Sequence, residues 1–474
     1  MTHEKQGPGA RSRGPGKPES GSRCTHAQAP FCILLLGMFP LSLGAQELNR
    51  DQMAQILQRL DALEQQNREL LSEIHALREL VAAKGAPESP TEGASAAAPT
   101  EERLAVDEQQ IHDLAQTRVE SEHRGPVQLT GMLLFNGYLN GRNSASQYPT
   151  VAALNSGQST DGATIRQTIL GLKFQAPEKI AGLDVSGSVY MDFFAGTGTS
   201  LNQVMRLRIA SIDFGWRNTT FSVAQDKPIL APREPDSLAQ VGVSPLTGAG
   251  NLWLWEPQAR LEQRFHFGET SGLRAQIGVF QTSERFNAPA QYSTQVTASR
   301  PALEGRFVFW KQSGDSRIEI APGFHVSETH IAGQRVPSRI ASIDWRVPLS
   351  SKFDITGTLF RGENMGVIGG LAQGVTERYE TGFHAVRGWG GWAQVKFQAT
   401  SRLTFNLFGG QEDDTSRDLA AGGITKNQSY GLNAIYRVMS NVLASFEWSY
   451  LTTSYLGSGV RTNPHYDVAF AYLF

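Results

Sequence analysis

From residue 127 to its end, the chain alternates apolar and polar side chains at every second position. The last eleven residues show this most clearly, because an aromatic or β-branched residue occupies every alternate place: Tyr466, Val468, Phe470, Tyr472 and Phe474. In an extended strand such residues share one face. The opposite face is mixed and partly polar, as in a strand that lies between lipid and water.

We count sixteen segments of this kind, near 127–141, 163–175, 183–194, 204–215, 219–226, 259–267, 273–279, 303–309, 318–326, 338–347, 353–359, 389–397, 403–407, 430–438, 442–450 and 464–474. Short turns follow the even-numbered segments, and long connections near 142–162, 227–256, 282–302, 364–388 and 413–427 follow odd-numbered ones. An even strand count with loops segregated in this way is typical of a transmembrane β-barrel. A β-sandwich has no reason to segregate its loops, and no blade repeat indicates a propeller. We therefore predict an all-β fold over 127–474, a 16-stranded antiparallel transmembrane β-barrel.

Composition excludes several other classes of protein. No apolar run after residue 45 approaches the roughly 18 residues of a membrane helix. The cysteines, Cys24 and Cys32, both precede residue 45, so that no disulfide framework or thiol chemistry is expected beyond it. The formal net charge of −2 gives no basic excess for nucleic acid. We expect no cofactor and no metal.

The N-terminal third has a different character. A basic region with Arg11, Arg13, Lys17 and Arg23 precedes an apolar core that ends at Ala45, which predicts a signal peptide over 1–45. Residues 46–82 carry apolar side chains in a heptad pattern that predicts an α-helical coiled coil. Residues 83–126 are a flexible linker by composition, with a weakly patterned helix over 101–121.

The coiled coil sets the expected oligomeric state. Its seam and flanking positions are Met53, Ile56, Arg59, Leu60, Leu63, Glu64, Asn67, Leu70, Ile74 and Leu77. The segment from Arg59 to Glu64 resembles the short signature of three-stranded coiled coils. A core asparagine such as Asn67 is more familiar from dimers, where it fixes the register. We favour a trimer, and a dimer remains the alternative.

A signal peptide, a coiled coil and a sixteen-segment barrel ending on Phe474 together resemble a trimeric outer-membrane porin. More narrowly, the layout resembles the DcaP-like porins, which carry an N-terminal coiled coil in the periplasm. The resemblance implies a homotrimer in outer-membrane lipid, passing small anionic solutes by passive diffusion. It also implies that Phe474 is the signal read by the barrel-assembly machinery.

Alternation assigns the pore-lining side chains by subtraction. If Leu261, Phe265 and Phe267 face lipid, the residues between them face inward, and a charge on the lipid face would cost about 2–4 kcal/mol near mid-membrane. The connection 227–256, the third outer one, is expected to narrow the lumen, since structureless loops of this length are usually functional. The candidate pore-lining residues are Arg206, Arg208, Arg260, Glu262, Arg264, Arg274, Arg306, Lys227, Arg233, Glu234 and Asp236. Rows of fixed cations in a narrow pore favour anions.

Three alternatives stay open. The arginines and carboxylates would merely stiffen the wall if they pair across it. The barrel would chiefly be an anchor if the coiled coil tethers the envelope through peptidoglycan or a periplasmic partner. A substrate-specific uptake channel would share the same architecture. An enzyme is not expected, because no Gly-x-Ser-x-Gly motif occurs and His325 and His330 fall on opposite faces of a strand.

Overall fold

The computed structural model describes residues 126–144, 150–196, 203–283, 292, 296–298, 301–314, 316–371, 373–378 and 381–474. The predicted signal peptide, coiled coil and linker lie outside these residues, as do the oligomerisation residues from Met53 to Leu77. Within the described ranges, no helix is long and apolar enough to cross a membrane.

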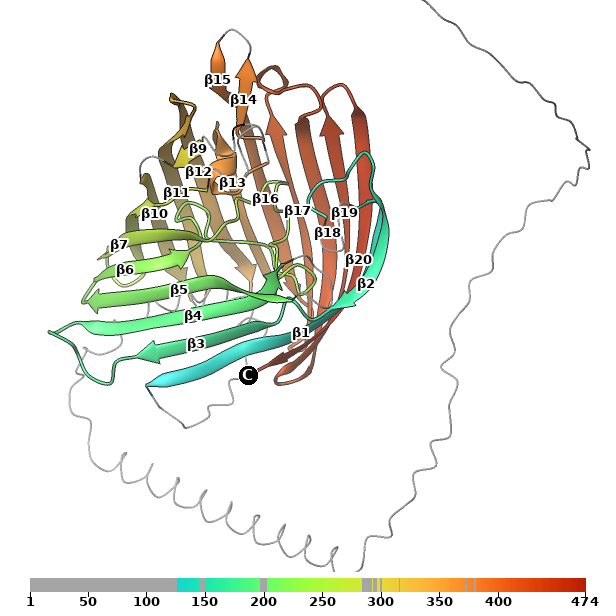
Figure 1. Cartoon of the computed structure of the whole chain (residues 1–474). Helices are drawn as coiled ribbons and strands as arrows, with labels where there is room; N and C mark the ends of the chain where they lie inside the picture. The colour runs from blue at the N-terminus through green and yellow to red at the C-terminus, as the bar shows by residue number, and fades with distance from the viewer. Residues whose placement is uncertain are drawn as a thin grey trace, which may run out of the picture. The chain divides into compact units, whose positions relative to one another are not determined.

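The chain forms a closed antiparallel barrel (Figure 1). Its wall consists of β1 (Val127–Ser144), β2 (Gln158–Thr164), β3 (Ile169–Gln175), β4 (Asp184–Ala195), β5 (Val204–Trp216), β6 (Thr219–Asp226), β7 (Glu256–His266), β8 (Ser271–Phe280), β9 (Val296–Ala298), β10 (Ala302–Ser313), β11 (Ser316–Ile331), β12 (Gln334–Ser350), β13 (Phe353–Glu363), β16 (Arg387–Gln398), β17 (Leu403–Asp414), β18 (Ile424–Met439), β19 (Val442–Tyr455) and β20 (Gly459–Leu473). Because β2 and β3 both pair with β1, and β9 and β10 both pair with β11, these strands fill sixteen places. The predicted 16-stranded antiparallel barrel is confirmed.

The first and last strands close the barrel. β1 pairs with β20 from Met132 opposite Leu473 to Asn140 opposite His465. The backbone of Phe474 adds two bonds, since Gly131 N donates to its carbonyl at 2.9 Å and its own N–H donates to Gly131 O at 3.1 Å. Within the described residues, every wall strand except β2 and β9 is thereby paired along both edges, as a barrel in lipid requires.

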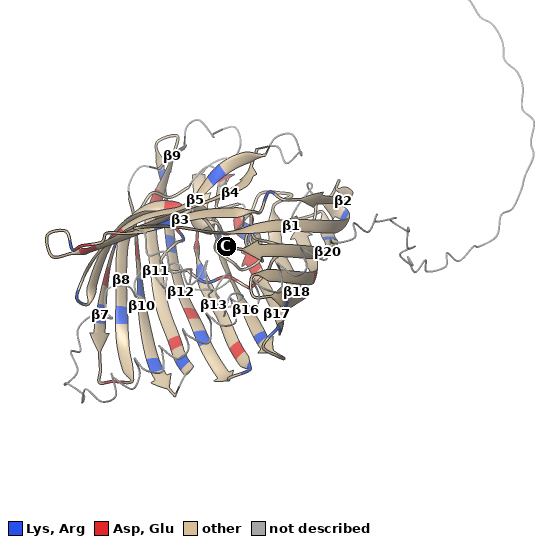
Figure 2. Cartoon of the chain, turned by 90° about the horizontal axis from the view of Figure 1, so that it is seen from below, with Lys and Arg blue, Asp and Glu red and all other residues tan. Residues whose placement is uncertain are grey.

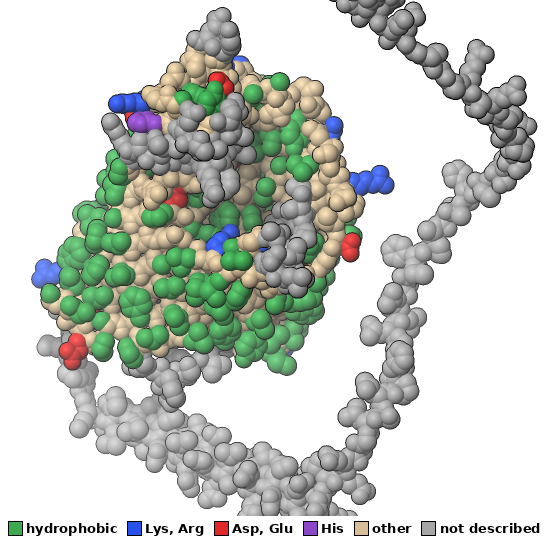
Figure 3. Space-filling model, viewed as in Figure 1, with side chains coloured by type: hydrophobic (Ala, Val, Ile, Leu, Met, Phe, Trp, Pro, Cys, Tyr) green, Lys and Arg blue, Asp and Glu red, His purple; other side chains and the backbone are tan. Residues whose placement is uncertain are grey.

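Side chains alternate between the two faces of the wall. On β7, Leu261 and Phe265 are exposed on the outside, whereas Glu262 between them is buried on the inside. Hydrophobic side chains spread over the outer surface that Figure 3 shows. An apolar outer surface around a polar interior is the arrangement of a barrel in a lipid bilayer.

Two connections at the rim of the long loops are short. β11 and β12 are joined through Ala332 and Gly333, and β19 and β20 through residues 456–458. These four strands have 14 to 17 residues and therefore use up the chain that would otherwise form a loop. The connection after β13 holds structure that alternation did not predict: the 3-10 helix η2 (Met365–Ile368) and a hairpin of β14 (Val375–Arg378) and β15 (Gly382–Ala385). A short 3-10 helix, η3 (Ser416–Asp418), follows β17.

Candidate pore interior

Residues 227–255, here called the inner loop, join β6 to β7 and contact the inner face of the barrel. Four prolines, Pro228, Pro232, Pro235 and Pro245, remove backbone donors and disfavour regular structure. Side chains of the wall bind several of the remaining backbone groups, and others bond within the loop, as buried backbone requires. Glu304 accepts a hydrogen bond from Ile229 N at 2.7 Å. Elsewhere on the wall, Gln167, Gln394 and Asn427 make similar hydrogen bonds to backbone groups of the loop.

Apolar side chains also attach the inner loop to the wall. Leu230 and Leu252 pack in one buried cluster with Ile340 and Phe360. Three further clusters pair a loop residue with wall residues; they contain Leu238 with Leu443, Ile229 with Phe280, and Leu246 with Trp392. These four hydrophobic clusters therefore lie inside the barrel, between its otherwise polar inner wall and the inner loop.

One glycine of the inner loop packs directly on the wall. Gly250 has a φ of +105°, and a Cβ there would lie 2.2 Å from Gly391 O and 2.7 Å from Gln411 O. Replacing Gly250 with alanine should displace this part of the loop, because both oxygens are backbone atoms of the wall and cannot rotate away as a flexible side chain would. We expect a loss of unfolding free energy clearly above the roughly 1–2 kcal/mol of left-handed strain alone, measured by urea unfolding in lipid vesicles.

Gly182 provides the matched control for that measurement. Its φ is +81° and a Cβ would meet nothing within 4 Å, so that alanine there introduces the strain without the collision. Equal losses for the two variants would contradict the close packing at Gly250.

Arg233 is the charged attachment of the inner loop. Its Nε donates to Asp344 at 2.9 Å, and its Nη2 pairs with Glu319. Asp344 also accepts two bonds from Arg306, at 2.7 and 2.8 Å. Burial lowers the pKa of Arg233, but the charges of Asp344 and Glu319 outweigh it and leave that pKa above its ordinary value. The guanidinium therefore stays charged although it is buried.

Arg206 and Arg208 hold the other end of the loop. Both pair with Asp192, at 2.6 and 3.1 Å, and donate to the loop carbonyls of Gly242 and Val241. Both guanidinium groups also lie over the ring of Trp255, at 4.8 and 4.7 Å from its centroid. These two predicted pore-lining arginines thus contact the inner loop.

The other predicted site residues are paired and differ in their exposure. Arg260 lies 3.9 Å from Asp226 and is 6% exposed. Glu262 binds Arg264 at 3.0 Å and lies 3.9 Å from Arg274. Lys227 and Glu234, both in the inner loop, pair with each other at 3.0 Å. Asp236 of the loop pairs with Lys396 of β16, also at 3.0 Å. Figure 2 shows that basic and acidic residues both occur on neighbouring strands of the barrel.

Sequence reasoning missed two arginines of this wall. Arg317 pairs with Glu319 at 2.8 Å and Arg346 with Asp354 at 2.8 Å, yet their side chains remain 42% and 35% exposed. Among the predicted arginines of this region, Arg264 has a side-chain exposure of only 16%. Arg317 could have been found from alternation, because it lies between Ser316 and Ile318 and shares the face of Glu319.

These residues form one electrostatic group, here called the arginine cluster. It contains six cations, Arg233, Arg264, Arg274, Arg306, Arg317 and Arg346, and four carboxylates, Glu262, Glu319, Asp344 and Asp354. Gln276 links two parts of the cluster, since it accepts from Arg306 at 3.2 Å and donates to Glu262 at 2.8 Å. Arg346 lies directly opposite Glu319 in the register of β11 and β12. The cluster has two more cations than anions.

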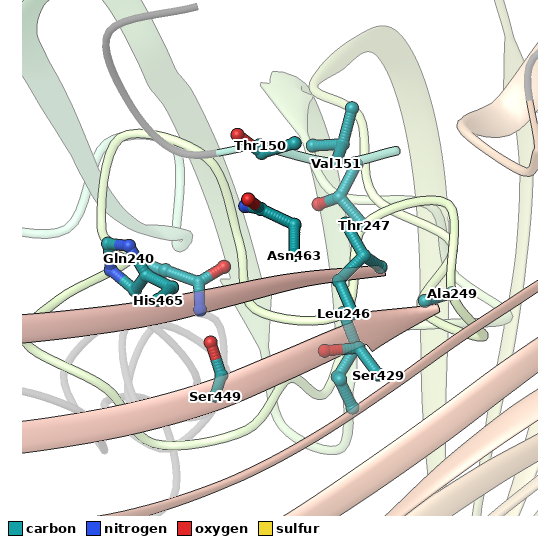
Figure 4. Close-up of a pocket in the computed structure, with 11 residues that line it drawn as sticks. Thr150, Val151, Gln240, Leu246, Thr247, Ala249, Ser429, Ser449, Asn463 and His465 are labelled. Atoms are coloured by element: carbon teal, nitrogen blue, oxygen red, sulfur yellow. The ribbon is translucent and has the colours of Figure 1, made fainter. Parts of the chain in front are cut away.

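A neutral, polar pocket lies on the opposite side of the inner loop (Figure 4). Gln240, Leu246 and Thr247 of the loop face Asn463 and Ser449 of β20 and β19 across it. Amide and hydroxyl groups supply both hydrogen-bond donors and acceptors without net charge. This pocket had no signal in the sequence, because a loop and two distant strands build it.

His325 and His330 lie on opposite faces of β11, as alternation indicated. His325 is buried and contacts Glu304 at 2.8 Å and Ser327 at 2.9 Å. His330 lies 3.6 Å from Glu328. In the described part of the chain, no group of three or more His, Cys, Asp or Glu side chains is placed to hold a metal ion.

The barrel is similar in structure to known outer-membrane channels. No family model matches the chain, and no curated protein matches it. The outer membrane channel DcaP of Acinetobacter baumannii has a similar structure, with a TM-score of 0.62 and 16% identity over 73% of this chain and 97% of that one. The chain has a porin fold. The anion-selective porin from Comamonas acidovorans is also similar, with a TM-score of 0.50 and 11% identity over 73% and 99% of the two chains.

Proposed function

We propose that this chain is an outer-membrane porin through which small hydrophilic solutes diffuse passively, with a preference for anions. The inner loop narrows the lumen, and the arginine cluster sets the charge preference. The porin fold and the apolar outer surface support the membrane location. Following the resemblance in the sequence, the protein is a homotrimer with its coiled coil in the periplasm, and Phe474 is its assembly signal.

The excess of cations in the arginine cluster is the observation that carries the anion preference. Pairing reduces the field of most inner arginines, because a carboxylate beside a guanidinium cancels much of its charge at a distance. Arg317 and Arg346 nevertheless present partly exposed heads, and six arginines share four carboxylates. A fixed positive excess in a narrow aqueous path raises the local concentration of anions.

Single-channel recording of the purified full chain in a planar bilayer under a salt gradient tests this proposal. We expect conductance steps in groups of three and a reversal potential directed toward anion selectivity. A cation-directed potential would contradict the role of the arginine cluster. A silent bilayer with a correctly folded barrel would instead support the alternative of an envelope anchor that binds peptidoglycan.

The neutral pocket favours a second candidate, a channel specific for one class of solute. Its cavity of about 20 Å³ has room for a single hydroxyl or amide group of a solute, to which Gln240, Ser449 and Asn463 would hydrogen-bond. A specific channel would show a flux that saturates with solute concentration, whereas a general pore would show a flux proportional to it. Solute-uptake assays in vesicles distinguish the two.

A further inference from the structure

Three strands carry arginines on the outer face of the barrel, near the rim of the long loops. Arg339 lies on β12, Arg361 on β13 and Arg387 on β16. Each shares its face with exposed apolar residues of the same strand: Ile343, Leu359 and Val395, respectively. These arginines therefore point away from the lumen.

Most of this positive charge is only weakly compensated. Arg361 has no carboxylate partner within the described part of the chain. Arg339 lies 3.8 Å from Glu363, and its side chain is 71% exposed. Arg387 alone is firmly bound, since it donates to both oxygens of Asp418 at 2.7 Å. Together with Arg417, these arginines line a pocket that also includes Glu363 and Trp389.

An apolar pocket adjoins the basic one. It is lined by Ala341, Ile343 and Leu359, and it shares Arg361 and Trp389 with its basic neighbour. The two pockets therefore form one continuous surface, basic toward the loop rim and apolar toward the middle of the wall. We call it the amphipathic surface.

The position of Arg361 relates this surface to the bilayer. Phe353, Phe397 and Phe405 stack on neighbouring strands near the short-turn rim, as an interfacial aromatic girdle does. Arg361 follows Phe353 by eight residues on β13, which is about 27 Å along a strand and about 20 Å along the axis at a tilt of about 40°. Since the apolar band of such barrels is about 25 Å tall, the backbone of Arg361 lies just inside its far edge, from which a long arginine side chain reaches the lipid headgroups.

We propose that the amphipathic surface binds a lipid whose headgroup carries a phosphate. Arg361, Arg339 and Arg417 would bind the phosphate oxygens, because planar guanidinium groups donate paired hydrogen bonds to phosphate. The acyl chains would lie on Ile343, Leu359 and the ring of Trp389. A free phosphate would leave the apolar pocket unused, and a water-soluble partner would not reach a surface at this depth. The proposal goes beyond channel activity and does not depend on it.

Native mass spectrometry of the detergent-solubilised full chain tests the proposal, with dioleoylphosphatidic acid as the probe. Dioleoylglycerol has the same acyl chains without the phosphate and should bind at least about tenfold more weakly. Arg361→Gln should weaken binding of the phosphatidic acid by about tenfold, since it removes a charge-assisted pair. Arg361→Lys keeps the charge but loses the paired guanidinium donors, and it should weaken lipid binding less than Arg361→Gln does. It provides a second measurement if the glutamine variant folds poorly.

Arg335→Gln is the matched control. Arg335 lies on the same face of β12 as Arg339, four residues closer to the loop rim, and its side chain is 61% exposed. Its loss should leave lipid binding unchanged. The proposal is overturned if Arg361→Gln and Arg335→Gln bind the lipid equally, or if dioleoylglycerol binds as tightly as phosphatidic acid. Complete displacement of the lipid by inorganic phosphate would also overturn it, in favour of a site for the free ion.

Discussion

Replacing Arg233 with alanine should cost about 3 kcal/mol of the free energy of unfolding, because breaking a buried ion pair leaves charges uncompensated. Arg233 is the only inner-loop residue of the arginine cluster, and it bridges Asp344 and Glu319 of two wall strands. Its loss should therefore also release the loop near residue 233. We expect larger and noisier single-channel currents, measured alongside urea unfolding in vesicles.

Arg346→Ala is the control for that loss of stability. Arg346 also pairs with a carboxylate of the inner wall, but its side chain is 35% exposed and it makes no contact with the inner loop among the bonds described above. Partly exposed pairs of this kind contribute about 1 kcal/mol or less. If the two variants lose the same stability, Arg233 does not attach the loop in the way proposed.

Replacing both Arg264 and Arg317 with glutamine should lower the anion-to-cation permeability ratio at least fivefold. One unit charge about 8 Å from a permeating ion in water is worth about 0.5 kcal/mol. Since the sign reverses for the counterion, each arginine shifts the ratio by about 1 kcal/mol, which is roughly fivefold. Salt screening reduces the effect, so that reversal potentials should be compared at low ionic strength.

The same measurement on Arg335→Gln separates the lumen from the outer face. That variant loses one positive charge from the outside of the wall, so that its reversal potential should match that of the unaltered protein. A double variant that also retains its full anion preference would show that the inner arginines only stiffen the wall through their pairs. Arg260 is less suitable for this test, because it is 6% exposed and lies beside Asp226.

The sequence by itself determined the barrel, its strand count and, where the alternation is regular, the face on which a wall residue lies. The reason is that side chains in a strand have a period of two, and lipid on one side makes that period visible as alternation. Leu261 and Phe265 could be placed outside, and Glu262 inside, without knowledge of any contact.

Only the tertiary structure decided what the inward residues contact. Alternation predicts polar side chains inside, yet Phe360 and Trp392 also face inward, because the inner loop brings Leu230 and Leu246 to cover them. Pairing depends in the same way on register between strands and on the path of the loop: Arg233 and Arg306 meet at Asp344 although 73 residues separate the two arginines in the chain. A period of two fixes the face of a side chain but carries no information about its partner, and the partner decides whether an arginine offers its charge to a solute or holds the wall together.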